Sequence, residues 1–184
     1  SPAQDQNGPE LVWQEKEGEV HLYDLTDLST GKACDERLPV FSCELKSEGT
    51  NTIASQEPQN IPIALLFILP GKRAVKGASW DYERDWFQVP ESPGTGLLVP
   101  KVRVRGRFKI AEVRDGIVEI SGSFAVFDGQ ERKGEWVPER APTATIETRQ
   151  IVNTRKRLLE SAQYILAGTV QAHVPVEQGL HYRP

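Results

Sequence analysis

The residues best suited to bind a charged partner form a row of alternating cations in the segment KVRVRGRFKI. Side chains of a β-strand alternate between its two faces, so every second residue of this segment shares one face. That face carries Lys101, Arg103, Arg105, Arg107 and Lys109. Such a row can dock an acidic protein, bind nucleic acid, polyanionic glycan or lipid head groups, or be a solvated face or one that protects a sheet edge. We expect the solvated or edge-protecting face, with an acidic protein as the main alternative.

A second segment, SWDYERDWF, interleaves carboxylates with aromatic rings. The candidate ligand residues in it are Trp80, Asp81, Tyr82, Glu83, Asp85 and Trp86. Carbohydrate-binding and glycoside-cleaving sites use this combination, because rings stack on sugar faces and partly desolvated acids have a raised pKa. A loop held by its rings, with its acids pointing to water, is the commoner arrangement, and we expect it here.

The two cysteines, Cys34 and Cys43, lie in the polar segment CDERLPVFSC. We predict a disulfide between them, which would contribute roughly 2–3 kcal/mol by closing a short ring. Two separate buried thiols or a reactive pair are the alternatives. Metal is disfavoured, because neither CxxC spacing nor a histidine cluster accompanies the pair. We therefore predict no metal and no cofactor.

Sequence motifs for catalysis are absent from the chain. It contains no GxSxG, Walker, GxGxxG or HExxH motif, each of which would place a nucleophile, a phosphate cradle or a zinc site. We therefore expect a protein that binds a partner rather than an enzyme, and we predict no catalytic residue.

The composition is typical of one globular domain. The chain has 184 residues, of which 38% are hydrophobic and 26% charged, and this length suits a single core. The net charge of −4 argues against bulk binding of nucleic acid. No window approaches the ~18–20 apolar residues of a membrane span, so none is predicted.

The first residues suggest an exported protein. The chain has no methionine and starts SPAQDQNGPE, which fits a mature protein whose signal peptide has been removed and fits a trimmed chain equally well. Together with the predicted disulfide, this start predicts a periplasmic or extracellular location.

The elements that must position these residues form one β-rich domain. We predict a flexible N-terminal tail over residues 1–10 and a single domain over 11–184. Within the domain, N-terminal strands occupy 11–70, an excursion rich in Gly, Pro and aromatic residues occupies 71–96, and a meander of long strands occupies 97–176.

The N-terminal strands are predicted from short patterns. We expect a hairpin that turns at Glu17 and Gly18, an irregular stretch or short helical turn over 25–38, and a strand at PVFSCEL. The run IPIALLFIL lacks alternation, which predicts a strand buried on both faces.

The register of the first long hairpin follows from its apolar residues. A three-residue loop at Arg114–Gly116 sets Val113 against Ile117, Ile110 against Ile120, Phe108 against Gly122, and Gly106 against Phe124. Each ring can then lie over the glycine opposite, which lets the strands bend.

Two further strands complete the predicted meander. They cover TATIETRQIV and LLESAQYILAGTVQAHVPV, and the second has Gly168 in its middle. The helical alternative for TRKRLLESAQYIL is weaker than the strand. The predicted fold is therefore mainly β, a strongly curved antiparallel meander with little helix, as a barrel, half-barrel or sandwich.

These observations predict a non-enzymatic, exported binding protein or an accessory or structural subunit that docks on a partner protein or assembly. The alternative is a carrier of a hydrophobic small molecule or lipid inside the curved sheet. Its small inward residues would be Gly106, Gly122, Ala162, Gly168 and Ala172. A hydrolase or carbohydrate-binding module using residues 80–87 is the weakest alternative.

Overall fold

A computed structural model describes residues 8–9, 11, 20–41, 52–53, 65–69, 71, 73–87, 101–169 and 177–183. Most of them lie in strands. The elements are β1 (Val20–Asp27), β2 (Lys32–Phe41), β3 (Thr52–Ile53), the 3-10 helix η2 (Leu65–Phe67), β4 (Ser79–Phe87), β5 (Lys101–Arg114), β6 (Ile117–Arg132), β7 (Glu135–Pro138), β8 (Ala144–Asn153), β9 (Leu158–Gly168) and β10 (Glu177–Arg183).

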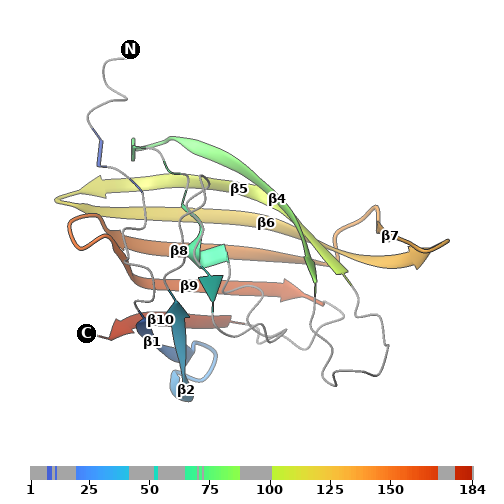
Figure 1. Cartoon of the computed structure of the whole chain (residues 1–184), viewed down its shortest axis with the longest axis horizontal. Helices are drawn as coiled ribbons and strands as arrows, with labels where there is room; N and C mark the ends of the chain where they lie inside the picture. Colours follow the sequence, from blue (N-terminus) through green and yellow to red (C-terminus); the bar gives the residue numbers. More distant parts are fainter. Residues whose placement is uncertain are drawn as a thin grey trace.

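The strands form one antiparallel sheet in the order β3-β2-β1-β10-β9-β8-β6-β5-β4, with β7 paired to β6. The two ends of this order are different strands, so the described part of the sheet is open. Figure 1 shows the long strands β5, β6, β8 and β9 side by side, with β4 along one margin and β10, β1 and β2 at the other. The prediction of a mainly β, antiparallel fold with almost no helix is confirmed, in its open form.

One face of the sheet, here called the inner face, carries the core. Buried residues alternate along β5, β6, β8 and β9, and η2 packs against β8 and β9. The largest fully buried side chains are Tyr23, Tyr164, Phe108, Leu11, Leu65, Leu66, Leu69, Ile110 and Ile120. The opposite face, called the outer face, carries Arg103, Arg105, Arg107 and the polar residues that alternate with the core. Strand alternation therefore places the core on one face and the arginines of β5 on the other.

The register predicted for the β5–β6 hairpin is confirmed beyond its turn, but the predicted turn is wrong. Ile110 pairs with Ile120, Phe108 with Gly122, and Gly106 with Phe124. The turn has two central residues, Asp115 and Gly116, both with positive φ (50° and 81°), as a type I′ hairpin requires. Near the turn Val113 therefore pairs with Val118, and a bulge between Ile110 and Glu112 restores the predicted register.

The predicted contact between rings and glycines is confirmed at Gly106 and differs at Gly122. A Cβ at Gly106 would meet the carbonyl oxygen of Ser123 and lie 2.6 Å from Phe124 Cα. At Gly122 the nearest atoms are Thr148 Oγ1 and the ring of Phe124, rather than Phe108. The ring of Phe124 therefore covers both glycines, which brings β5 and β6 into close contact at this point.

Two predictions for the N-terminal half need correction. Lys32–Phe41 is one strand, so residues 32–38 are not irregular. The first three residues of the predicted strand PVFSCEL, at 39–41, lie in this strand, and its other residues lie outside the described ones. The apolar run at 61–69 forms η2 rather than a buried strand where it is described. Leu65, Leu66 and Leu69 are nevertheless buried, because the run packs onto the inner face, and a run without periodicity does not distinguish the two structures.

The N-terminal tail is described only in part. Residues 1–7, and the hairpin predicted at Glu17 and Gly18, lie outside the described residues. Gly8 and Pro9 accept hydrogen bonds at their carbonyl oxygens from Arg73 Nη1 (3.0 Å) and the Ala74 amide (2.7 Å), respectively. Leu11 is buried in the core.

The last part of the chain also differs from its prediction. Strand is confirmed over Leu158–Gly168, so the helical alternative is wrong there. Gly168 does not lie mid-strand: it ends β9 with φ of 109°, a conformation that favours glycine. Ala172 and His173 lie outside the described residues, and β10 then pairs with β9 and β1.

Candidate functional site

The two segments singled out in the sequence lie next to each other in the sheet. SWDYERDWF is not a loop: it is strand β4, paired antiparallel to the basic strand β5 along its full length. The register sets Asp81 against Arg107, Glu83 against Arg105, and Asp85 against Arg103. Each central arginine of the row therefore has an acid directly opposite, an arrangement that stabilises neighbouring strands.

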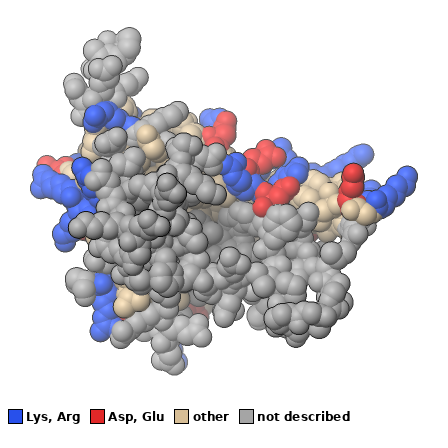
Figure 2. Space-filling view, viewed as in Figure 1, with Lys and Arg blue, Asp and Glu red and all other residues tan. Residues whose placement is uncertain are grey.

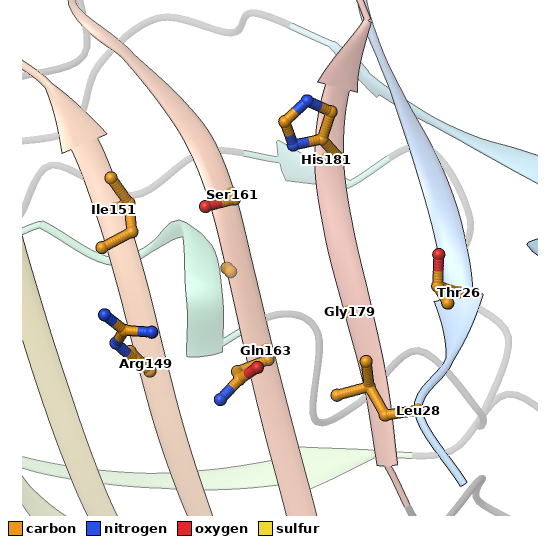
Figure 3. A pocket seen from close by; sticks show the side chains of 9 residues that line it. Thr26, Leu28, Arg149, Ile151, Ser161, Gln163, Gly179 and His181 are labelled. Carbon is orange, nitrogen blue, oxygen red and sulfur yellow. The ribbon is translucent and has the colours of Figure 1, made fainter. Parts of the chain in front are cut away.

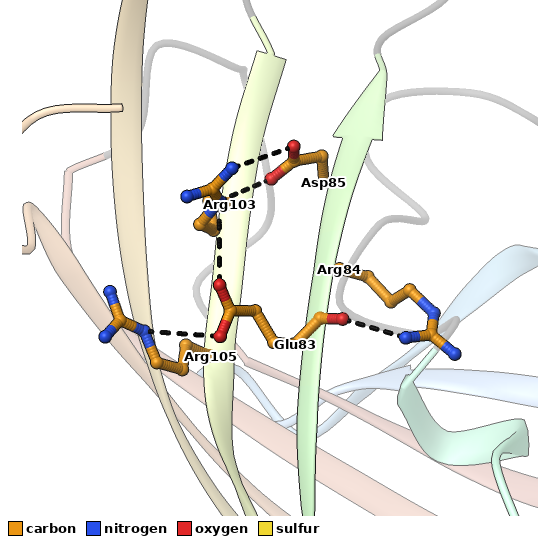
Figure 4. A network of polar contacts seen from close by, with 5 residues as sticks. All are labelled: Glu83, Arg84, Asp85, Arg103 and Arg105. Carbon is orange, nitrogen blue, oxygen red and sulfur yellow. Dashed lines mark hydrogen bonds and ion pairs between the residues drawn. The ribbon is translucent and has the colours of Figure 1, made fainter. Parts of the chain in front are cut away.

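These residues form an ion-pair ladder on the outer face. Figure 4 shows the part of it made by Glu83, Asp85, Arg103 and Arg105. Arg103 makes a bidentate contact with Asp85, with Nε–Oδ1 at 2.7 Å and Nη2–Oδ2 at 3.1 Å. Arg107 Nε donates to Asp81 Oδ1 at 2.8 Å. The two Glu83 oxygens lie 3.9 Å from the Nε atoms of Arg103 and Arg105. Figure 2 shows acidic and basic side chains interspersed over this part of the molecule. The row of cations is thus largely neutralised by β4.

The other members of the row have different neighbours. Lys109 is exposed and pairs with Ser79 and Ser121, and within the described residues it makes no ion pair. The side chain of Lys101 lies outside the described residues. Because β5 lies between β4 and β6, the basic row does not sit on a sheet edge, and the expectation that it protects an edge is wrong.

The rings of β4 lie on the opposite face from its acids. Trp80 stacks on Phe108, with ring centroids 5.0 Å apart. Tyr82 meets Phe108 and Phe124 edge to face, at 5.9 Å each, within the inner-face core. Strand alternation therefore separates the carboxylates from these rings, and Asp81, Glu83 and Asp85 do not share a sugar-binding surface with Trp80 or Tyr82. The side chain of Trp86 lies outside the described residues.

Arg103 is the most strongly held arginine of the ladder. Its guanidinium lies 5.5 Å from the ring centroid of Trp136 on β7, and its side chain is only 29% exposed. Its hydrogen bond to Asp85 is the main cause that raises the pKa of Arg103. By comparison, the Arg107 side chain is 63% exposed. Arg103 therefore joins β4, β5 and β7.

We expect Arg103→Met to lower the free energy of unfolding by about 1 kcal/mol, and Arg107→Met by roughly 0–0.5 kcal/mol. Of these two arginines, only Arg103 makes a bidentate contact with a carboxylate and a cation–π contact. These contacts are the reason for its larger expected loss of stability. Urea unfolding at low and high salt measures it. Equal losses for both variants would contradict the special role of Arg103.

A groove opens on the outer face over β8, β9, β10 and β1, away from the ladder (Figure 3). Its volume is about 220 Å³. The residues lining it are Thr26, Leu28, Arg149, Ile151, Ser161, Ala162, Gln163, Gly179 and His181. Gly179 leaves the floor open, because it lies between Gln163 and Thr26 in the cross-strand register and has no side chain.

This groove was not predicted from the sequence. Its polar residues come from segments distant in sequence and match no motif. The one local signal was Gly179 inside the alternating segment EQGLHYR, since a glycine within a strand marks a bend or a close approach.

Arg149 at the groove is held by Glu119 of β6. Arg149 Nε donates to Glu119 Oε1 at 2.7 Å and Nη2 donates to Oε2 at 3.2 Å. This hydrogen bonding lowers the pKa of Glu119 below its ordinary value of 4.5 and raises the pKa of Arg149. Both groups are therefore charged at neutral pH.

The lowered pKa of Glu119 makes this pair acid-sensitive. Glu119 binds a proton more readily in the unfolded chain than in the folded protein. The contribution of the pair to stability is therefore complete above the ordinary pKa of Glu119, and it is lost as the pH falls through the lower pKa of the folded protein. We expect Glu119→Gln to reduce the difference in free energy of unfolding between about pH 6 and about pH 3. Urea midpoints at the two pH values test this, with Glu147→Gln as the control. An unchanged difference would contradict it.

The remaining predictions concern cysteines, metals and membranes. Cys43 lies outside the described residues, so the disulfide with Cys34 stays a prediction. Within the described ranges, no cluster of three or more His, Cys, Asp or Glu residues is placed to hold a metal ion. The described helical structure includes no segment long and apolar enough to cross a bilayer.

Comparisons of the chain with protein-family models, curated proteins and solved structures give no match.

Proposed function

We propose that the chain is a non-enzymatic, exported accessory or structural subunit that docks on a partner protein through the outer face of its sheet. The observation that carries this proposal is the set of apolar side chains on the outer side of β1, the turn after it, and β9. Leu22 and Leu28 are each 37% exposed and Ile165 is 43% exposed. With the groove between β8 and β1, they provide apolar contact area with polar groups beside it, the composition typical of protein interfaces.

The basic row is a weaker docking surface than its sequence suggested. An acidic partner that bound Arg103, Arg105 and Arg107 would have to displace Asp81, Glu83 and Asp85. Such displacement gains little, because exposed ion pairs contribute only about 0–1 kcal/mol each. We therefore place the partner over the outer face of β8, β9, β10 and β1.

Photo-crosslinking in the native host tests this placement. A photoreactive amino acid at Ile165 should crosslink the partner, and the same probe at Lys109 on the outer face of β5 should not. Native mass spectrometry of the purified complex then gives its composition. Crosslinking only from Lys109 would place the partner on the basic row, and no stable complex in the host would contradict the subunit role.

Export is part of the proposal and has its own test. The support is the predicted Cys34–Cys43 disulfide and the composition of the chain. Alkylation of fractionated cells should find both cysteines blocked and the protein outside the cytoplasm. Freely alkylated cysteines in a cytoplasmic fraction would overturn it.

A second candidate, a carrier of a hydrophobic molecule, is favoured by one observation on the inner face. Thr148 Oγ1 and Gln150 Oε1 are buried and have no hydrogen-bond partner among the described residues. They lie on one strand, two residues apart, and Gln150 pairs with the small residue Ala162. A buried polar atom without a partner costs roughly 1–3 kcal/mol, so the polar end of a ligand bound there would be stabilising.

The space over the inward glycines does not support the carrier. Phe124 fills it at both Gly106 and Gly122. Displacement of an apolar dye, together with native mass spectrometry for a co-purified lipid, distinguishes the two functions. Saturable displacement that Gln150→Leu abolishes would favour the carrier, and a lipid-free protein in a stable complex would favour the subunit.

A further inference from the structure

The groove presents hydrogen-bond donors from four neighbouring strands. In the cross-strand register, Arg149 is next to Gln163, Gln163 is next to Gly179, and Gly179 is next to Thr26. The adjacent row sets Ser161 beside His181. Figure 3 shows these side chains around the open position at Gly179. The sheet thus brings the side chains to one place without any loop.

These donors are not used within the described part of the protein. The side chains of Thr26, Ser161, Gln163 and His181 make no hydrogen bond to other described residues. Arg149 uses Nε and one Nη2 hydrogen for Glu119. A guanidinium has five N–H groups in a planar fork, so three remain for a ligand.

Three nearby acids already have partners: two lie beside cations, and Glu147 accepts a hydrogen bond from Ser123 Oγ at 2.7 Å. Glu119 is bound by Arg149, and Asp24, which pairs with His181 across the strands, lies 3.8 Å from Arg183 Nη1. Among the described residues, no Asp or Glu lines the groove itself. An acceptor-rich group therefore fits better than a donor-rich one.

The size and walls of the groove restrict the occupant further. A volume of about 220 Å³ exceeds the share of one water molecule, about 30 Å³, several times over. Leu28 and Ile151 form apolar walls beside the polar groups. A short apolar stem with a carboxylate at its end matches the volume of the groove and its mixture of apolar and polar residues. Guanidinium–carboxylate contacts are among the strongest hydrogen bonds in proteins.

We propose that this groove binds the carboxylate side chain of an Asp or Glu in an acidic segment of the partner protein. The proposal rests on the subunit function and specifies the chemistry of the docking contact. Arg149 and Gln163 donate to the carboxylate, Ser161 and His181 complete its hydrogen bonds, and the stem lies between Leu28 and Ile151.

Gly179→Ala is the sharpest variant for the test. The added Cβ would lie 3.2 Å from Leu28 Cδ2 and 3.8 Å from the Ala162 carbonyl oxygen. Leu28 is a partly exposed side chain that can shift, so the fold is preserved while the floor is raised. Arg149→Gln tests the groove in a second way, because it removes the positive charge and leaves the floor unchanged. Arg107→Gln is the matched control on the outer face of β5.

Amide chemical shifts of the full chain are followed by NMR during titration with the capped peptide Ac-Gly-Ser-Glu-Asp-Ser-Gly-NH2 and with its Gln-Asn counterpart. We expect saturable shifts at Gln163, Gly179 and His181 with the acidic peptide, at a Kd on the order of 1 mM. Binding should weaken about fivefold or more in Gly179→Ala and Arg149→Gln and stay unchanged in Arg107→Gln.

Three results of the titration would each overturn the proposal: no saturable shift, equal binding of the Gln-Asn peptide, or equal weakening in Arg107→Gln. Failure of the subunit function has a different signature. If the peptide binds as expected but no complex exists in the host, the groove takes carboxylates and the subunit role is wrong. If the host complex exists and is unaffected by Gly179→Ala, the subunit role stands and the groove assignment is wrong.

Discussion

Gly106→Ala is expected to lower the free energy of unfolding by about 3 kcal/mol, as overpacking at a rigid site does. The new methyl group would meet the carbonyl oxygen of Ser123 and lie 2.6 Å from Phe124 Cα. These are backbone atoms of the paired strand, so no side-chain rotation relieves the contact. The strands would therefore have to separate at this position.

Gly179→Ala is the matched comparison, because it also adds a methyl group to a strand glycine. Its nearest atom belongs to the side chain of Leu28, and we expect a change within about 0.5 kcal/mol. Urea unfolding of both variants measures the difference. If both variants lose the same stability, replacing any strand glycine destabilises the protein, and the close approach of the strands at Gly106 is not the cause.

Phe124→Ala is expected to destabilise the protein by roughly 3–5 kcal/mol, because it removes a buried ring and leaves a cavity. Phe124 is 2% exposed, contacts Phe108 with centroids 4.8 Å apart, and meets Tyr82 edge to face. It also covers Gly106 and Gly122. One substitution therefore disturbs β4, β5 and β6 together.

Phe127→Ala is the control for Phe124→Ala. Phe127 lies on the outer face of the same strand, is half-buried, and has Arg105 over its ring at 5.0 Å. We expect its loss to cost about 1 kcal/mol. Chemical denaturation compares the two, and similar losses would mean that the core does not depend on the Phe124 ring.

The meander was predictable from the sequence because alternation and turn residues determine it locally. The apolar positions of β5 and β6 allow only one register that buries them all, so the pairs of Gly106 and Phe108 were found correctly. The turn was not, because a two-residue turn with a bulge and a three-residue loop bury the same residues. The pattern of buried residues does not distinguish them.

The candidate sites were less predictable, because they depend on which strands become neighbours. Nothing in the segments themselves shows that Asp81 lies opposite Arg107, although both rows have a two-residue period that permits it. The groove depends on β10 joining β9 to β1, a long-range pairing. The apolar run before β4 was correctly predicted to be buried, because burial follows from its composition. It was not predicted to be a 3-10 helix, because its backbone conformation is determined by packing.

The acidic row of β4 has a further consequence for association between copies of the chain. β4 is the last strand in the described order of the sheet, and a second copy pairing antiparallel along it would bring Asp81, Glu83 and Asp85 against their own counterparts. Like charges directly opposite each other destabilise such a pair. The carboxylates that neutralise β5 thus also disfavour pairing of two copies through β4, a protection that their replacement by neutral residues would remove.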